Sequence, residues 1–117
     1  MIAMEPDNQD ALFVYGSLLD QAHLTALLGR EVACTPARLG GYERRRGRYF
    51  YIVARARGEV AGVVLNGLGE RDFTVLDRYE EVPKLYTRVK IEVAAAGDVA
   101  LRCWVYLPTP ALLTSET

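Results

Sequence analysis

Leu12-Phe13-Val14-Tyr15-Gly16-Ser17-Leu18 is the stretch of this 117-residue sequence that decides its fold. Its apolar first half is stopped by a Gly-Ser pair, which is typical of a buried strand that ends in a tight turn. Apolar residues then recur at mostly helical spacing until Gly29 ends the pattern. The sequence therefore predicts a strand near 12–15, a sharp turn and a helix near 19–28.

Turn residues divide the following part of the chain into strands. One strand is predicted within the segment from Val32 to Tyr42, which carries Gly40-Gly41 at its far end. Two hairpins are predicted after it: strands near 49–55 and 60–65 joined at Arg57-Gly58-Glu59, and strands near 86–93 and 99–107 joined at Gly97-Asp98. Two consecutive hairpins make most of the sheet antiparallel.

The clearest helix is predicted at 69–81, before Pro83 stops the pattern. Glu80 lies seven residues after Phe73 and four after Leu76, so it projects from the apolar stripe of this helix. Its neighbour Glu81 falls on the polar side. A carboxylate on an apolar face is partly desolvated, which raises its pKa and suits general acid/base chemistry near neutral pH.

Glu80 is accordingly the candidate catalytic residue. The alternative is a glutamate at a frayed helix end that reaches water or pairs with an arginine. The second candidate is the turn at Gly16-Ser17, because backbone amides just before a helix point outward, where they can hold a carboxylate or a developing oxyanion. Ser17 could equally be a plain N-cap of the helix.

These patterns predict an α+β fold, a small mixed and mainly antiparallel β-barrel of about six strands with about two helices against it. The length is that of one domain. We expect a flexible N-terminal segment at 1–10, the folded domain at 11–110 and a C-terminal tail at 111–117.

Charge and composition narrow the classes of partner. The formal net charge of −1 gives the whole molecule no attraction to nucleic acid or to an anionic membrane. Seven of the fourteen basic residues are arginines between Arg38 and Arg57, which could contact phosphate or RNA but are expected to form a solvated loop. We expect no nucleic-acid partner and no membrane partner, and the sequence does not fix the oligomeric state.

The remaining reactive side chains give no sign of a metal site. Cys34 and Cys103 are expected to be buried, reduced thiols, and His23 is expected at the surface of a helix. The acidic, polar start of the sequence lacks a signal-peptide pattern, and no apolar run reaches the roughly 20 residues that span a bilayer. The expected location is the cytoplasm.

Five short motifs occur in an order that resembles a known family. They are Leu12 to Leu18, Gly62-Val63-Val64-Leu65 with Leu68, Leu76-Asp77-Arg78-Tyr79-Glu80, the pair Tyr86 and Arg88, and Trp104-Val105-Tyr106. Together they span nearly the whole chain and resemble the gamma-glutamylcyclotransferase-like proteins, in particular the small members of the gamma-glutamylamine cyclotransferase type.

The resemblance implies a small barrel with a cavity at its mouth, and an enzyme that cleaves a γ-glutamyl amide or peptide into 5-oxoproline and a free amine without a cofactor. It implies that Glu80 is the general acid/base. It also implies that the turn formed by Tyr15, Gly16, Ser17 and Leu18 holds the substrate, and that Tyr86 hydrogen-bonds Glu80 or the substrate. The alternative function is a non-catalytic module of the same fold that binds a small molecule.

Overall fold

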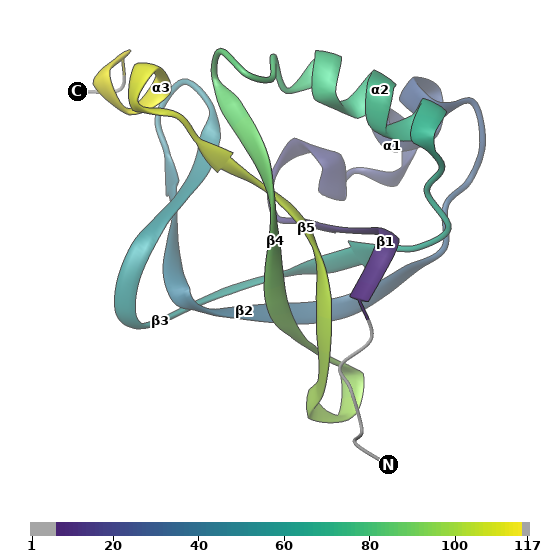
Figure 1. Cartoon of the computed structure of the whole chain (residues 1–117), viewed down its shortest axis with the longest axis horizontal. Coiled ribbons are helices and arrows are strands. Elements are labelled where there is room, and N and C mark those ends of the chain that lie inside the picture. The colour runs from purple at the N-terminus through teal and green to yellow at the C-terminus, as the bar shows by residue number, and fades with distance from the viewer. Residues whose placement is uncertain (1–6, 116–117) are drawn as a thin grey trace.

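The structure is a computed structural model that describes residues 7–115, and its strands close into a barrel (Figure 1). The strands are β1 (Asp7–Val14), β2 (Cys34–Arg46), β3 (Phe50–Leu65), β4 (Tyr86–Ala95) and β5 (Val99–Pro108). Around the barrel they follow the order β1-β3-β2-β4-β5. Only the β1–β5 pair is parallel among these described strands. The predicted fold class, a mixed and mainly antiparallel barrel, is confirmed.

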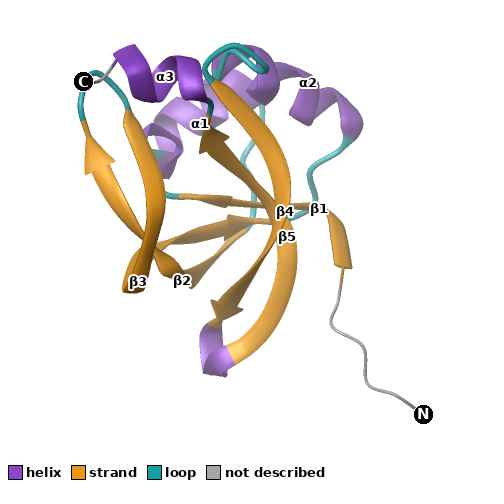
Figure 2. Ribbon diagram, turned by 60° about the vertical axis from the view of Figure 1, so that its left-hand side comes forward, coloured by secondary structure: helices purple, strands orange, loops and turns teal. Residues whose placement is uncertain are grey.

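Helices α1 and α2 lie together on one side of the barrel (Figures 1 and 2). The helical elements are η1 (Ser17–Leu19), α1 (Gln21–Leu28), α2 (Glu70–Tyr79), η2 (Ala96–Asp98) and α3 (Pro110–Ser115). None of the helices within residues 7–115 is long and apolar enough to cross a membrane.

The strand β1 separates two apolar clusters. Its side chains alternate across the sheet, so Leu12 and Val14 join the cluster that includes Leu24 and Leu76 from the helices. Phe13 points the other way, into the cluster inside the barrel. Because both faces of β1 are buried, its sequence is a continuous apolar run and does not alternate with polar residues.

The predicted hairpin between strands 49–55 and 60–65 is wrong. These residues form the single 16-residue strand β3, and the hairpin joins β2 to β3, with Arg46 opposite Phe50. Residues 55–58 form a bulge, since the register changes from Gly40↔Glu59 to Tyr42↔Ala54. Turn-forming residues therefore bend a long strand here, and the barrel has five strands within the described chain where about six were expected.

The helix α3 lies in the region predicted to be a tail. Its Leu112 is fully buried in the cluster under the helices, and the backbone N–H of Leu112 donates to Thr109 Oγ1 at 3.3 Å. A threonine followed by proline at the first helical position is a helix-start signal that the tail prediction overlooked. The rest of the predicted tail, 116–117, and residues 1–6 of the predicted N-terminal segment lie outside the described residues.

Both cysteines are free thiols, but their environments differ. Cys103 is buried as expected, whereas Cys34 is exposed because it is the first residue of β2 and its side chain lies on the outer face. The prediction of a buried Cys34 was therefore wrong.

Candidate active site

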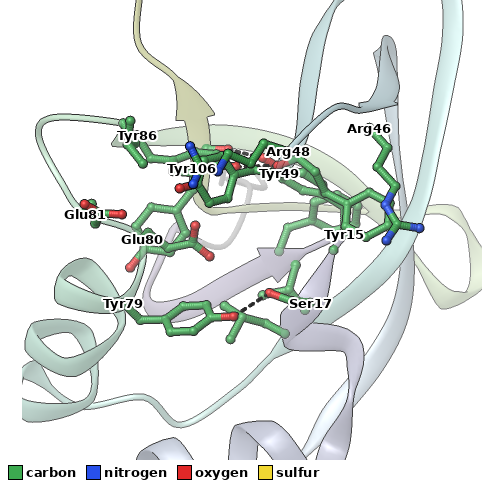
Figure 3. Close-up of a pocket in the computed structure, with 16 residues that line it drawn as sticks. Tyr15, Ser17, Arg46, Arg48, Tyr49, Tyr79, Glu80, Glu81, Tyr86 and Tyr106 are labelled. Atoms are coloured by element: carbon green, nitrogen blue, oxygen red, sulfur yellow. Dashed lines mark hydrogen bonds between the residues drawn. The ribbon is translucent and has the colours of Figure 1, made fainter. Parts of the chain in front are cut away.

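A cavity of about 350 Å³ lies where the turn after β1, the tip of the β2–β3 hairpin and the C-terminal end of α2 meet (Figure 3). The start of β4 and the end of β5 complete its wall. All six residues singled out in the sequence line this cavity: Tyr15, Gly16, Ser17, Leu18, Glu80 and Tyr86. The fold thus gathers three segments that are far apart in the sequence.

The turn after β1 is fixed on both sides. The buried Tyr15 hydroxyl donates to the carbonyl of Tyr106 at 2.7 Å, and Arg44 Nη1 donates to the carbonyl of Tyr15 at 2.9 Å. Gly16 lies against β3, where an added Cβ would be 2.9 Å from Phe50 Cβ. Real Cβ atoms essentially never come so close to another atom, so a side chain at this position would force the turn or β3 to shift.

The first backbone N–H groups of η1 have no acceptor within that short helix. In η1, Leu19 N donates to the carbonyl of Gly16 at 3.0 Å and Asp20 N donates to that of Ser17 at 3.2 Å. These bonds occupy the carbonyls of Gly16 and Ser17. The backbone N–H groups of the first residues of η1 have no acceptor within the helix. The N-cap of α1 is Asp20, which accepts from His23 N, so the alternative role of Ser17 as a plain N-cap is not what the structure shows.

Glu80 is the C-cap of α2, and its backbone N–H donates to the carbonyl of Leu76 at 2.9 Å. Its side chain is half-buried and lies in the middle of the lining residues, while the exposed Glu81 lies at their edge (Figure 3). Glu81 has a positive φ of 54°, the left-handed conformation that commonly ends a helix and that turns the two neighbours in different directions.

Burial raises the pKa of Glu80 from 4.5 to about 7. No ion pair within residues 7–115 involves this carboxylate. Among these residues it does not pair with an arginine, which was one part of the alternative that the sequence left open; the other part was a glutamate that reaches water from a frayed helix end. A carboxyl group that titrates near neutral pH can both take up and release a proton under ordinary conditions.

The raised pKa predicts a pH-dependent stability. Below pH 4.5 the carboxyl group is protonated in the folded and the unfolded chain, so it does not lower the free energy of unfolding. That free energy falls as the pH rises through about 7, because the folded chain must then hold a buried charge. We expect Glu80→Gln to raise the free energy of unfolding by about 2 kcal/mol at about pH 8 and to change it little at about pH 4. Urea unfolding at both pH values would measure this. Glu81→Gln is the control, and an equal gain at both pH values for Glu80→Gln would contradict a buried, titrating carboxyl.

Tyr79 joins the turn to the helices and was missed as a site residue. Its hydroxyl lies 2.8 Å from Ser17 Oγ and 3.0 Å from His23 Nε2, and the rings of Tyr79 and His23 meet edge to face at 5.2 Å (Figure 3). His23 is partly exposed, as expected of a surface helix, but it also supports this side of the cavity. Its sequence neighbours gave no sign of this contact, which spans 56 residues.

Tyr106 and Asp77 hold the other side of the cavity. The Tyr106 hydroxyl donates to Asp77 Oδ1 at 2.6 Å, and Arg88 binds both Asp77 oxygens, at 2.9 and 3.2 Å. The Arg88 guanidinium is stacked between the rings of Phe73 and Trp104, at 4.4 and 4.3 Å. This network ties the last turn of α2, and with it Glu80, to β4 and β5.

The hydroxyl groups of Tyr15 and Tyr106 remain protonated. Burial, followed by nearby Tyr86 and Glu80, raises the pKa of Tyr15 above its ordinary value, and burial with the bond to Asp77 raises that of Tyr106. The Tyr86 hydroxyl donates to the carbonyl of Phe50, which connects β4 to the hairpin. Within residues 7–115, no three His, Cys, Asp or Glu side chains form a group that could hold a metal ion.

Comparison with known proteins gives relatives along the same stretch of chain. Residues 12–116 match the family described as Gamma-glutamyl cyclotransferase, AIG2-like. Protein AIG2 C of Arabidopsis thaliana is 33% identical over 96 residues, which cover 80% of this chain and 56% of that protein. AIG2-like protein C of the same plant is 39% identical over 85 residues, covering 70% of this chain and 48% of its own. The chain therefore spans about half the length of these curated relatives.

Solved structures share the fold. The solution structure of an Arabidopsis thaliana protein superposes with a TM-score of 0.80 at 28% identity and covers 92% of this chain and 74% of its own. A gamma-glutamyl cyclotransferase superposes with a TM-score of 0.78 at 23% identity, covering 86% of this chain and 66% of its own. At this identity the second likeness establishes the fold alone.

Proposed function

Because this chain belongs to the AIG2-like gamma-glutamyl cyclotransferase family, we propose that it cleaves γ-glutamyl amides or peptides in the cavity that holds Glu80. The substrate's own α-amine attacks its γ-carbonyl carbon. A C–N bond forms to close a five-membered lactam, and the original γ-amide C–N bond breaks. The products are 5-oxoproline and a free amine, and the reaction consumes no water, oxidant or reductant.

Glu80 acts in this proposal as the general acid/base. As a carboxylate it takes a proton from the substrate's ammonium group, which frees the lone pair for attack. As a carboxylic acid it returns a proton to the departing nitrogen, which would otherwise leave as an unstable amide anion. A carboxyl pKa of about 7 allows both steps at neutral pH.

The turn after β1 binds and orients the substrate. In this proposal the backbone N–H groups of Gly16, Ser17 and Leu18 donate to the substrate's α-carboxylate, which is supported by the first amides of η1 having no acceptor within that helix. Fixing the α-carboxylate folds the substrate back on itself. Well-oriented intramolecular reactions reach effective molarities of about 10⁵ M or more, so orientation supplies much of the rate.

What supports the proposal most is that a desolvated carboxyl group and the turn before η1 line one small cavity. The same cavity would also suit a non-catalytic module that binds a γ-glutamyl compound. The pKa of Glu80 favours catalysis over binding alone. A carboxylate that only bound the substrate's ammonium group would bind it more tightly if it stayed charged well below pH 7, and so would not need a raised pKa.

The test is to incubate the protein with a panel of γ-glutamyl amines and γ-glutamyl peptides and to measure 5-oxoproline and the released amine. We expect the two products in equal amounts, and neither product from the matching α-glutamyl compounds, because their amine is bound at the α-carbonyl and attack on the γ-carbon cannot release it. Free glutamate in place of 5-oxoproline would indicate a hydrolase. Binding without any product would favour the non-catalytic module.

A further inference from the structure

We infer that His23 and Tyr79 are positioning residues that fix the direction in which the Ser17 hydroxyl donates its proton. The Tyr79 hydroxyl lies 2.8 Å from Ser17 Oγ (Figure 3) and 3.0 Å from His23 Nε2, so the three side chains form one hydrogen-bonded chain. This rests on the proposed function for the substrate's α-carboxylate at the turn. It adds two residues outside the turn that help to bind that carboxylate.

The chain of hydrogen bonds runs from the surface of one helix into the cavity. Ser17 and Tyr79 line the cavity, whereas His23 is not among the lining residues and lies behind Tyr79. Each comes from a different element, Ser17 from η1, His23 from α1 and Tyr79 from the end of α2. His23 can therefore act on a ligand in the cavity only through Tyr79.

His23 decides which way the protons in this chain point. The Tyr79 hydroxyl has one proton and two partners, so it can donate to only one of them. An imidazolium ring, or a neutral ring with its proton on Nε2, donates from Nε2 and leaves the Tyr79 proton for Ser17 Oγ. Only the neutral tautomer with a bare Nε2 accepts from Tyr79 and reverses the chain. Two of the three forms of the ring thus give the first direction.

The direction of the chain determines what Ser17 offers to a ligand. When Ser17 Oγ accepts from Tyr79, its own proton is left for another acceptor, and within residues 7–115 the hydroxyl has no second partner. A carboxylate bound at the turn is such an acceptor. In the reversed chain the Ser17 proton points to Tyr79, and the lone pairs of Ser17 Oγ would face the carboxylate and repel it.

The first test breaks the chain one member at a time. Calorimetry with γ-glutamylglycine in the Glu80→Gln background measures binding without turnover. We expect Ser17→Ala to weaken binding about tenfold, because a hydrogen bond to a charged group is lost. Tyr79→Phe should weaken it about threefold, because the Ser17 hydroxyl is then free to turn. The double variant should bind no more weakly than Ser17→Ala alone, because Tyr79 acts through Ser17.

The second test sets the direction of the chain by substitution at position 23. A lysine ammonium group can only donate and an ionised glutamate can only accept. We therefore expect His23→Lys to bind γ-glutamylglycine within about twofold of the parent and His23→Glu to bind it about tenfold more weakly. His23 is only partly buried, and Ser17 and Tyr79 are exposed, so all these variants are expected to fold.

The lysine and glutamate variants also differ in charge, so both are repeated in the Tyr79→Phe background. There the chain is broken and only the effect of charge through space remains. We expect most of the difference between His23→Lys and His23→Glu to disappear. A structural brace between α1 and α2 would not respond to the choice between a donor and an acceptor in this way.

Three results would overturn the inference. One is an equal difference between the two position-23 variants with and without the Tyr79 hydroxyl, because charge alone would then explain it. Another is additive losses for Ser17→Ala and Tyr79→Phe, which would make Tyr79 an independent contact. The third is no binding of γ-glutamylglycine at all. Failure of the proposed function looks different, namely the expected pattern of binding with no 5-oxoproline from the wild-type protein.

Discussion

Glu80→Gln is expected to lower the rate of 5-oxoproline formation by about 10³-fold while the barrel stays folded. The amide has nearly the shape of the carboxyl group, so the cavity is not disturbed. It cannot exchange a proton at neutral pH, so it can neither deprotonate the attacking amine nor protonate the departing nitrogen. The comparison is made at saturating substrate, because the loss is expected in kcat.

Glu81→Gln is the matched control for this substitution. Glu81 is the next residue, carries the same group and is exposed at the edge of the cavity. We expect its kcat to stay within about twofold of wild type, because its side chain is exposed and substitutions of exposed side chains usually have small effects. A large loss for Glu81→Gln with none for Glu80→Gln would show that the acid/base residue has been assigned to the wrong face of the helix.

Gly16→Ala is expected to lower kcat/KM by about 10²-fold, because misplacing the substrate by about 1 Å can cost that much. The new methyl group would lie 2.9 Å from Phe50 Cβ, so either the turn or β3 must move. That movement shifts the amides proposed to hold the α-carboxylate. Steady-state kinetics with a γ-glutamyl peptide would measure the loss, mainly in KM.

Gly40→Ala separates this effect from the general cost of replacing a glycine. Gly40 lies in β2, has no positive φ, and has open space where its Cβ would be. We expect near wild-type kinetics for it. Equal losses in both variants, or an unchanged kcat/KM for Gly16→Ala, would argue against a binding role for the turn.

The sequence predicted those parts of the site that depend on local pattern. Helical spacing was enough to separate Glu80 from Glu81, and the Gly-Ser pair was enough to locate the turn. In the structure the same spacing holds, although α2 ends at Tyr79 and Glu80 is its cap. Both local signals survive because they depend on neighbours within one or two helical turns.

The parts that were missed depend on contacts between distant segments. Nothing near His23 or Tyr79 in the sequence indicates that they meet. Likewise, nothing in the arginine-rich segment indicates that Arg46 lines the cavity and Arg45 does not, because this depends on the hairpin. The strand β3 was predicted as two strands because Arg57-Gly58-Glu59 has turn chemistry, and only pairing with β2 makes it a bulge. Tertiary pairing thus overrides a correct local signal.

The parallel pairing of β1 with β5 has a consequence for the biosynthesis of the protein. The first described strand pairs with the last, so the sheet cannot close on the ribosome until residues 99–108 have emerged. Until then β1 and β4 both present unpaired edges, which are the surfaces through which nascent chains aggregate. A protein whose contacts join its two ends is also expected to fold slowly for its size. We therefore expect a ribosome-stalled chain that lacks β5 to be protease-sensitive and to recruit chaperones, and protection to appear only when β5 is translated.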